Sequence, residues 1–283
     1  MPNLITSIEG LDVLDRVGGP IAAAVRKAVR SDAAQSALAG TWLGHKLHPV
    51  LTDVPIGAWS MACLLDASAG PAGAREARRL VGIGILAAVP TAMTGANDWS
   101  LGYGPEQRLG LVHGLANAAG TTCQAMSWIA RRRGRRGRGI ALSALGVGFT
   151  LGAAYLGGHL TLVRGVGVDH TAFEPTVSEW TDVAAESDVR EGDPLRVSAA
   201  GIPVMLVRRG PDIHGLSATC VHAGGPLDQG KLVGDDCIAC PWHGSVFRLA
   251  DGHAVRGPAA EAQPRWAVRV DAGRVLVRSG SAR

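Results

Sequence analysis

The sequence predicts a two-part protein, an all-α four-helix transmembrane bundle followed by an all-β antiparallel sandwich domain. Long apolar runs occupy the first part, and short runs bounded by Gly and Pro occupy the second part. Two Cys/His pairs lie among the short runs and indicate a metal-binding function. The expected boundaries are a polar amphipathic lead-in at 1–47, the transmembrane domain at 48–164, a linker at 165–193 and the β domain at 194–280.

Four runs with few or no charged residues predict four membrane helices, at 50–69, 80–97, 109–130 and 140–163. About 20 apolar residues, at a rise of about 1.5 Å each, match a hydrocarbon layer about 30 Å thick. A soluble bundle of buried helices is the alternative. Confinement of most charges to the joints between the runs favours the membrane.

Arginine in two joints predicts the orientation of the helices. The joint at 131–138 has six Arg in eight residues, and the joint between the first two runs carries Arg75, Arg78 and Arg79. Such joints stay in the cytoplasm. With four spans, both termini, and with them the β domain, are then expected on the external side of a multi-pass cell-membrane protein.

The distribution of charge excludes nucleic acid as a partner. The net charge is +4, and its positive excess lies in the first 173 residues, next to the apolar runs. Neither helix-turn-helix nor zinc-finger spacing is present, and aromatic residues are few. The lipid membrane is therefore the expected partner of the basic half.

Short β-type runs after the linker predict an antiparallel sandwich. They are 195–199, 202–208, 212–217, 237–239, 245–248, 266–270 and 274–277. The linker itself is rich in Glu, Asp, Ser, Thr and Pro over 171–193, which is typical of an extended tether.

Two Cys/His pairs carry the chemistry. Cys220 and His222 are followed, after 17 intervening residues, by Cys240 and His243. Each pair supplies one thiolate and one imidazole, which is the set that holds a [2Fe–2S] cluster with two Cys on one iron and two His on the other. A zinc site is the alternative, because Cys237 and Cys240 form a Cys-x-x-Cys pair.

The segment resembles a Rieske domain, through C-V-H-A-G-G-P-L at 220–227 and C-P-W-H-G-S-x-F at 240–247. The resemblance implies a sandwich from which two cluster-binding loops project. It also implies that Gly224, Gly225 and Gly244 let backbone amides approach the sulfides, and that Ser245 can donate to a bridging sulfide.

Two departures from the family pattern are informative. Rieske proteins of cytochrome bc complexes usually carry a disulfide between the loops, where this chain has Gly225 and Trp242; Rieske ferredoxins that serve oxygenases lack it. Phe247 replaces the usual Tyr donor of the respiratory type, so we expect a reduction potential in the lower part of the range of about −150 to +300 mV. The missing disulfide favours a reducing compartment, which opposes the external placement.

Three histidines are expected near one membrane surface. His48 lies just before the first run, His113 lies in the first turns of the third, and His159 lies near the end of the fourth. Ionisable groups at this depth are functional candidates. They are candidate ligands of a b-type haem or neighbours of a quinone; alternatively, backbone and water satisfy each of them in the interfacial zone.

The amino-terminal half resembles a four-helix membrane domain family of unknown function that is often fused to Rieske modules. The motif L-G-H-K-L-H-P-V-L-T-D-V-P-I-G-A-W at 43–59 carries this resemblance, together with 113–117 and 157–159. It implies an architecture and no activity.

The resulting hypothesis is a membrane-anchored electron-transfer protein that carries a Rieske-type [2Fe–2S] cluster and serves an oxidoreductase system. Redox partner proteins or quinone are its expected partners. The alternatives are a subunit of a quinol or haem-linked membrane oxidoreductase, and a zinc-stabilised binding module on a membrane anchor.

Overall fold

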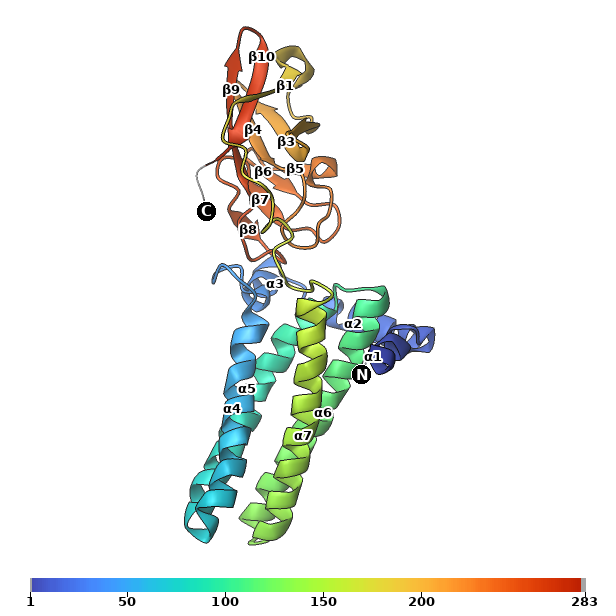
Figure 1. Cartoon of the computed structure of the whole chain (residues 1–283), viewed down its shortest axis with the longest axis vertical. Helices are drawn as coiled ribbons and strands as arrows, with labels where there is room; N and C mark the ends of the chain where they lie inside the picture. Colours follow the sequence, from blue (N-terminus) through green and yellow to red (C-terminus); the bar gives the residue numbers. More distant parts are fainter. Residues whose placement is uncertain (1, 281–283) are drawn as a thin grey trace. The chain divides into compact units, whose positions relative to one another are not determined.

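The computed structural model describes residues 2–280 and divides them into two compact units (Figure 1). Residues 2–30 and 47–166 form a helical unit, whereas residues 31–46 and 167–280 form a unit dominated by β-strands. The segment 31–46 therefore groups with the β-strands, although it precedes the long helices in the sequence.

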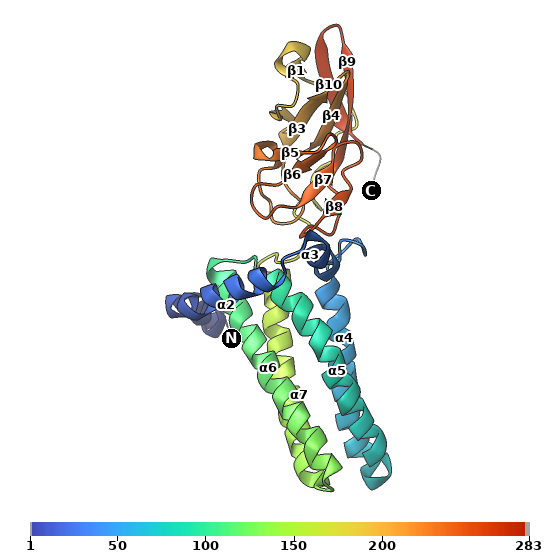
Figure 2. The same cartoon turned by 180° about the vertical axis from the view of Figure 1, so that it is seen from behind.

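Four long helices run side by side in the helical unit (Figures 1 and 2). They are α4 (Leu47–Ser68), α5 (Ala74–Trp99), α6 (Gly104–Arg132) and α7 (Arg136–Leu162), preceded by the short α1 (Pro2–Glu9) and α2 (Asp15–Ala28). Each long helix coincides with one of the four predicted apolar runs, to within one residue at its carboxy-terminal end or with the whole run inside it.

Small residues allow the long helices to approach closely. A Cβ atom at Gly146 of α7 would lie 3.0 Å from the carbonyl oxygen of Gly120 on α6, so these backbones are almost in contact. Between α4 and α5, Trp59 Nε1 donates to the carbonyl oxygen of Val81 at 3.3 Å, and the ring lies over Gly84. Close backbone approach is how helices associate in lipid.

Three helices in the described part of the chain are long and apolar enough to cross a membrane: α4, α5 and α7. The predicted fourth span lies in α6, which is not among them, so the structure does not confirm a count of four. The physical reason is that α6 carries polar side chains directed at α7. Gln124 Nε2 donates to the carbonyl oxygen of Ser143 at 3.1 Å, and Ser127 Oγ donates to that of Gly139 at 2.6 Å.

Two antiparallel sheets make up the β domain. The first has the order β1-β10-β9-β4-β3-β2 and the second has the order β5-β6-β7-β8. The strands are β1 (Thr181–Ala185), β2 (Leu195–Ala199), β3 (Ile202–Arg209), β4 (Asp212–Ser217), β5 (Lys231–Val233), β6 (Cys237–Ala239), β7 (Val246–Arg248), β8 (Ala254–Arg256), β9 (Arg265–Asp271) and β10 (Arg274–Ser279).

All seven predicted β-type runs are strands, and β1, β5 and β8 are additional. β1 lies inside the predicted linker 165–193, where it pairs with β10 at the edge of the first sheet. The exposed Asp182 fits an edge strand, because one face of an antiparallel sheet can meet water.

A short helix, α3 (Asp32–Ala39), lies inside the predicted lead-in and packs against β8 in Figures 1 and 2. Ser31 caps it by accepting a hydrogen bond from the Ala34 N–H at 3.1 Å, and Gly40 ends it with a left-handed φ of 85°. These local signals determine where the helix begins and ends. The strand it packs against, β8, lies more than 200 residues further along the chain.

Candidate metal centre

The four predicted cluster ligands lie on two loops with the same backbone hydrogen bonds. In the first loop, the Cys220 N–H donates to the carbonyl oxygen of Gly225 at 2.8 Å, and the Gly224 N–H donates back to that of Cys220 at 2.9 Å. In the second, Cys240 and Ser245 are joined at 2.8 Å, and the Gly244 N–H reaches the Cys240 carbonyl at 3.1 Å. The two loops therefore present their Cys and His residues in matching ways.

Gly224 and Gly244 occupy equivalent places in these loops and need glycine for the same reason. Their φ angles are +72° and +76°, in the left-handed region that disfavours residues with a Cβ. The turn brings each cysteine sulfur close to the N–H groups that follow it.

Both cysteine sulfurs are buried and receive backbone hydrogen bonds. Cys220 is 1% exposed and Cys240 is 4% exposed. The N–H groups of His222 and Ala223 are directed to the first sulfur, and those of Trp242 and His243 to the second. Such donors stabilise a thiolate, which is the form that binds a metal.

The two thiols also contact each other. The hydrogen bond between them raises the pKa of Cys220 and lowers that of Cys240 to about 7, while burial raises both. Two sulfurs at hydrogen-bonding distance can bind the same metal ion.

The imidazoles lie beside the thiols but nearer to solvent. The ring centroids of His222 and His243 are 5.0 Å apart and the rings are almost perpendicular, and both residues are half-buried. Burial, together with the neighbouring Lys46, His243 and His170, lowers the pKa of His222 to about 2. The ring is therefore neutral, as metal ligation requires.

Gly225 and Trp242 lie against each other across the two loops. A Cβ atom at position 225 would be 2.9 Å from Cδ2 of the Trp242 ring. The contact thus occupies the place where the resemblance implies a disulfide in other Rieske proteins, and a van der Waals contact takes the place of a covalent bond.

Ser245 and Phe247 are both buried behind the second loop. Ser245 Oγ accepts a hydrogen bond from the Ala259 N–H at 2.9 Å, which leaves the hydroxyl proton for a further acceptor. Phe247 has no donor to offer. The loss of one hydrogen bond to the metal centre at this position stays a prediction.

Gln263 holds the first loop and was not predicted. Its Nε2 donates to the carbonyl oxygens of Ser217 at 2.8 Å and Thr219 at 2.6 Å, and its Oε1 accepts from the Val221 N–H at 3.0 Å. It is 1% exposed. Nothing in the sequence marks it, because its partners are backbone groups more than 40 residues away.

Arg256 holds the second loop and was also not predicted. Its Nη2 donates to the carbonyl oxygen of Gly244 at 2.9 Å, and its Nη1 pairs with Asp32 of α3 at 2.9 Å. Two further hydrogen bonds join the segment 31–46 to the loop after β8. The Gly257 N–H donates to Ser36 Oγ at 3.0 Å, and Thr41 Oγ1 donates to the carbonyl oxygen of Ala259 at 2.9 Å.

Cys237 does not join the centre. It lies on β6, opposite Val233 on one side and Arg248 on the other, and burial raises its pKa. Within residues 2–280, no three His, Cys, Asp or Glu side chains are arranged to hold a single metal ion. A [2Fe–2S] core places its ligands on two irons, so its four ligands do not need to converge on one point.

The structure brings together two of the three membrane histidines. The ring centroids of His48 and His113 are 6.4 Å apart, with the Nδ1 atoms bonded to the carbonyl oxygens of Thr91 and Ala153. His159 Nε2 lies 3.8 Å from Glu9. A single site made of all three histidines stays a prediction.

Two protein families match the chain. The Rieske [2Fe-2S] domain family matches residues 179–269, and the family described as predicted membrane protein (DUF2231) matches residues 44–170. The chain thus joins an amino-terminal domain of the DUF2231 predicted membrane protein family to a carboxy-terminal Rieske [2Fe-2S] domain.

Curated relatives match the Rieske part. The ferredoxin component of the naphthalene 1,2-dioxygenase system of Pseudomonas putida is 28% identical over 99 residues, which cover 35% of this chain and 94% of the relative. Cholesterol 7-desaturase nvd of Drosophila melanogaster is 33% identical over 92 residues, which cover 32% of this chain. The chain spans about a fifth of the length of that relative, 21%.

Solved structures match the same part. The ferredoxin of carbazole 1,9a-dioxygenase from Nocardioides aromaticivorans IC177 is 29% identical, with a TM-score of 0.35, over 36% of this chain and 100% of the ferredoxin. A chain from the complex of reduced oxygenase and oxidised ferredoxin in carbazole 1,9a-dioxygenase is 32% identical, with a TM-score of 0.33, over 35% and 92% of the two chains. The homology to ferredoxin components implies electron transfer.

Proposed function

We propose that this protein is a membrane-anchored one-electron carrier, in which Cys220 and Cys240 hold one iron of a [2Fe–2S] cluster and His222 and His243 hold the other. The matched pair of loops carries the proposal, because it places two buried thiols next to two half-buried imidazoles. The cluster supplies the capacity to accept and release one electron.

Different groups of the chain stabilise the two kinds of ligand at the centre. Backbone N–H groups stabilise both thiolates and burial keeps His222 neutral. The imidazole side is nearer to solvent than the thiols, and it is therefore the side at which electrons enter and leave. Phe247 supplies no hydroxyl donor, which favours a potential in the lower part of the range of about −150 to +300 mV.

Two cysteines provide a matched test of the ligand set. We expect full-length protein, isolated without oxygen, to contain iron and acid-labile sulfide in equal amounts, and to give a rhombic EPR signal of low average g when reduced. Cys240→Ser should lose the signal, whereas Cys237→Ser should retain it. A zinc-stabilised module would instead contain zinc, give no such signal, and refute the proposal.

Protein partners are the proposed source and destination of the electron. Ferredoxin components of dioxygenase systems are similar to the carboxy-terminal part, and one similar structure is a complex with an oxygenase. We therefore expect a reductase-type donor and an oxidoreductase-type acceptor to dock at the exposed edge of His222, His243 and Trp242. Single-turnover reduction by candidate flavoprotein reductases, followed at the cluster absorption band, tests this step.

The helical unit is proposed to span the cell membrane four times, with α6 as the fourth span. Three helices are apolar enough to cross alone, and large apolar side chains such as Leu64, Leu86 and Leu151 are exposed on their surfaces. The polar side chains of α6 donate hydrogen bonds to carbonyl oxygens of α7. Because these groups are satisfied within the protein, α6 can cross the membrane packed against α7. Extraction of the protein by detergent but not by alkaline carbonate is the expected behaviour.

The Rieske domain is proposed to lie on the external side, because the Arg-rich joint at 131–138 favours the cytoplasm. Protease added to intact cells should then release a carboxy-terminal fragment by cleavage between 167 and 180. Cleavage at this segment solely in inverted vesicles would place the domain in the cytoplasm.

A quinol or haem-linked role is a second candidate, and the closeness of His48 to His113 bears on it. The observation in its favour is that both Nδ1 atoms are fixed by carbonyl oxygens, as in many ligating histidines. Against ligation, Asn117 Nδ2 lies 3.1 Å from His113 Nε2 and occupies that nitrogen. A purified sample without a Soret band would exclude the haem version.

A further inference from the structure

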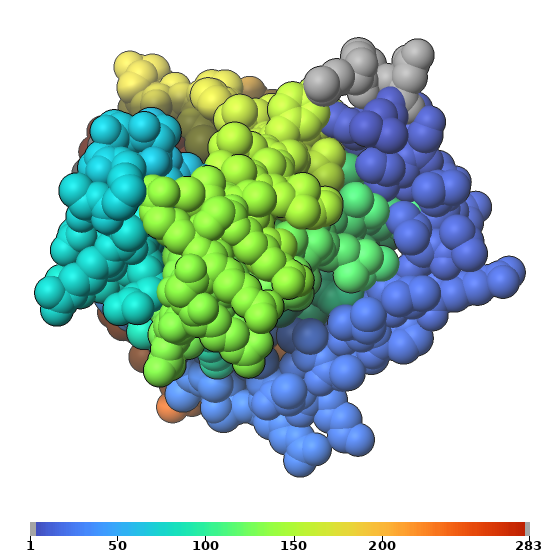
Figure 3. All heavy atoms as spheres, turned by 90° about the horizontal axis from the view of Figure 1, so that it is seen from below, coloured from blue at the N-terminus to red at the C-terminus, as the bar shows by residue number. Residues whose placement is uncertain are grey.

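Two turns of the helical unit line an open, basic cavity. The turn between α4 and α5 lies beside the turn between α6 and α7, in cyan and yellow-green in Figure 3. The cavity has a volume of about 340 Å³ and is lined by Ala74 and four arginines: Arg75, Arg78, Arg131 and Arg136.

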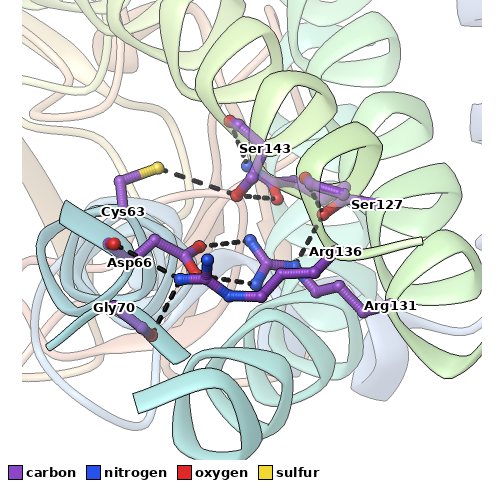
Figure 4. Close-up of polar contacts among 9 residues, drawn as sticks. Cys63, Asp66, Gly70, Ser127, Arg131, Arg136 and Ser143 are labelled. Carbon is purple, nitrogen blue, oxygen red and sulfur yellow. Dashed lines mark hydrogen bonds and ion pairs between the residues drawn. The ribbon is translucent and has the colours of Figure 1, made fainter. Parts of the chain in front are cut away.

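A buried carboxylate positions two of these arginines (Figure 4). Asp66, 2% exposed, pairs in a bidentate manner with Arg131, 3% exposed, and its Oδ1 lies 3.3 Å from Arg136 Nη2. Arg131 Nε donates to Ser127 Oγ at 3.1 Å, and Arg136 Nη2 donates to the Gly70 carbonyl at 2.8 Å. This network of hydrogen bonds and ion pairs joins both turns, and residues of all four long helices take part in it or line the cavity beside it.

Gly139 of α7 leaves room for the side chain of Arg131 at the wall of the cavity. A Cβ atom at position 139 would be 2.6 Å from Arg131 Cγ. The guanidinium is thus held at the wall of the cavity and has little freedom to turn toward solvent.

Charge within the cavity is not balanced. Asp66 neutralises one of four guanidinium groups, and Arg136 Nε is buried without a hydrogen-bond partner. In the described part of the chain, Arg75 and Arg78 take part in no ion pair, and the nearest acidic residue in sequence, Glu76, pairs with Arg79 at 4.0 Å instead. A buried charged donor without an acceptor is costly, so an anion would stabilise the cavity.

We propose that this cavity binds a phosphate group, with Arg75, Arg78 and Arg136 as donors and with Arg131 and Asp66 as the buried support. The site is separate from the cluster loops and does not depend on electron transfer. Guanidinium forks match the geometry of phosphate oxygens, which can accept from several donors at once. Membrane proteins also use basic pockets between helices for anionic lipid headgroups.

The size of the cavity fits a headgroup-sized ligand, because small-molecule pockets begin at about 300 Å³. The phosphate can belong to an anionic phospholipid or be inorganic phosphate, since both present the same oxygens. The chemistry of recognition is shared, and binding experiments with two kinds of ligand distinguish the sources.

The test uses the full-length protein in a non-ionic detergent. One arm measures the Kd of short-chain phosphatidylglycerol against phosphatidylcholine of the same chain length. The other measures the Kd of inorganic phosphate at constant ionic strength, with chloride as the replaced anion. We expect at least one of the phosphate ligands to bind, and saturating binding in one arm with none in the other assigns the source.

A matched pair of variants separates a site from diffuse attraction. The double variant Arg75→Gln/Arg78→Gln removes two cavity charges that support no observed contact, and we expect its Kd to rise about tenfold or more. Arg79→Gln/Arg133→Gln removes the same charge outside the cavity and should leave the Kd within about twofold.

Several outcomes would overturn the proposal. Equal weakening in both double variants would mean that only net charge matters, and absence of binding in both arms of the wild-type titration would mean that there is no site. Circular dichroism and the cluster EPR signal check that each variant is folded. Competition between inorganic phosphate and phosphatidylglycerol on the wild-type chain gives a second readout that needs no variant.

Discussion

Gln263 provides the sharpest test of how the first cluster loop is held. We consider Gln263→Leu, which keeps the side-chain size and removes the amide. Three hydrogen bonds are lost, to the carbonyl oxygens of Ser217 and Thr219 and from the Val221 N–H. Because Gln263 is 1% exposed, water does not readily replace the lost partners.

The expected cost follows from the number of groups left unsatisfied. Each buried group without a partner costs about 1–3 kcal/mol, so three groups cost roughly 3–6 kcal/mol, allowing for partial relaxation. A domain of this size is stabilised by about 5–15 kcal/mol in total. The variant is therefore expected to be close to the limit of folding.

Urea unfolding of the full-length protein in detergent, followed by the visible absorption of the cluster, measures the effect. With a slope of about 1–3 kcal/mol per M urea, the midpoint should fall by about 1 M or more. Gln229→Leu is the matched control, because Gln229 is exposed and makes no observed side-chain bond. A midpoint for Gln263→Leu within about 0.3 M of the control would refute the reasoning.

Three further predictions concern single positions in the two units. Ser245→Ala should lower the midpoint potential in a redox titration by about 60 mV, which corresponds to about 1.4 kcal/mol of lost hydroxyl donation to the reduced state. Asp66→Asn should destabilise the helical unit by about 3–5 kcal/mol in thermal unfolding, because Arg131 is left buried without its charge partner. Gly146→Ala should destabilise the same unit by about 1–3 kcal/mol by forcing α6 and α7 apart, whereas Gly148→Ala, with open space around its Cβ, should be neutral or slightly stabilising.

Each of these predictions has a control in the same element or domain. Ser198→Ala on β2 should leave the potential unchanged, since this residue is exposed and lies outside both loops. Asp53→Asn on α4 removes an exposed charge and should change the unfolding midpoint little. Equal effects at Asp66 and Asp53, or at Gly146 and Gly148, would show that the buried contacts are not responsible.

Local patterns predicted the candidate cluster ligands and most of the elements. Cys220, His222, Cys240 and His243 stand in two short motifs, so the loop that presents them is specified by residues that are close in sequence. The four apolar runs likewise predicted the four long helices, since hydropathy is a property of a continuous segment. The exception is whether α6 spans the membrane, because its polar residues donate hydrogen bonds to carbonyl oxygens of α7, which only the tertiary structure shows.

The sequence by itself determined that a pair of segments bearing thiol and imidazole side chains follows a set of apolar helices, because each of those signals is local. Tertiary structure alone decided that Gln263, Arg256 and α3 brace the loops, that His48 lies beside His113, and that four arginines from two turns face one cavity. The physical reason is the same in each case. These contacts join groups that are distant in sequence, often through backbone atoms, and no local pattern encodes which distant groups will meet.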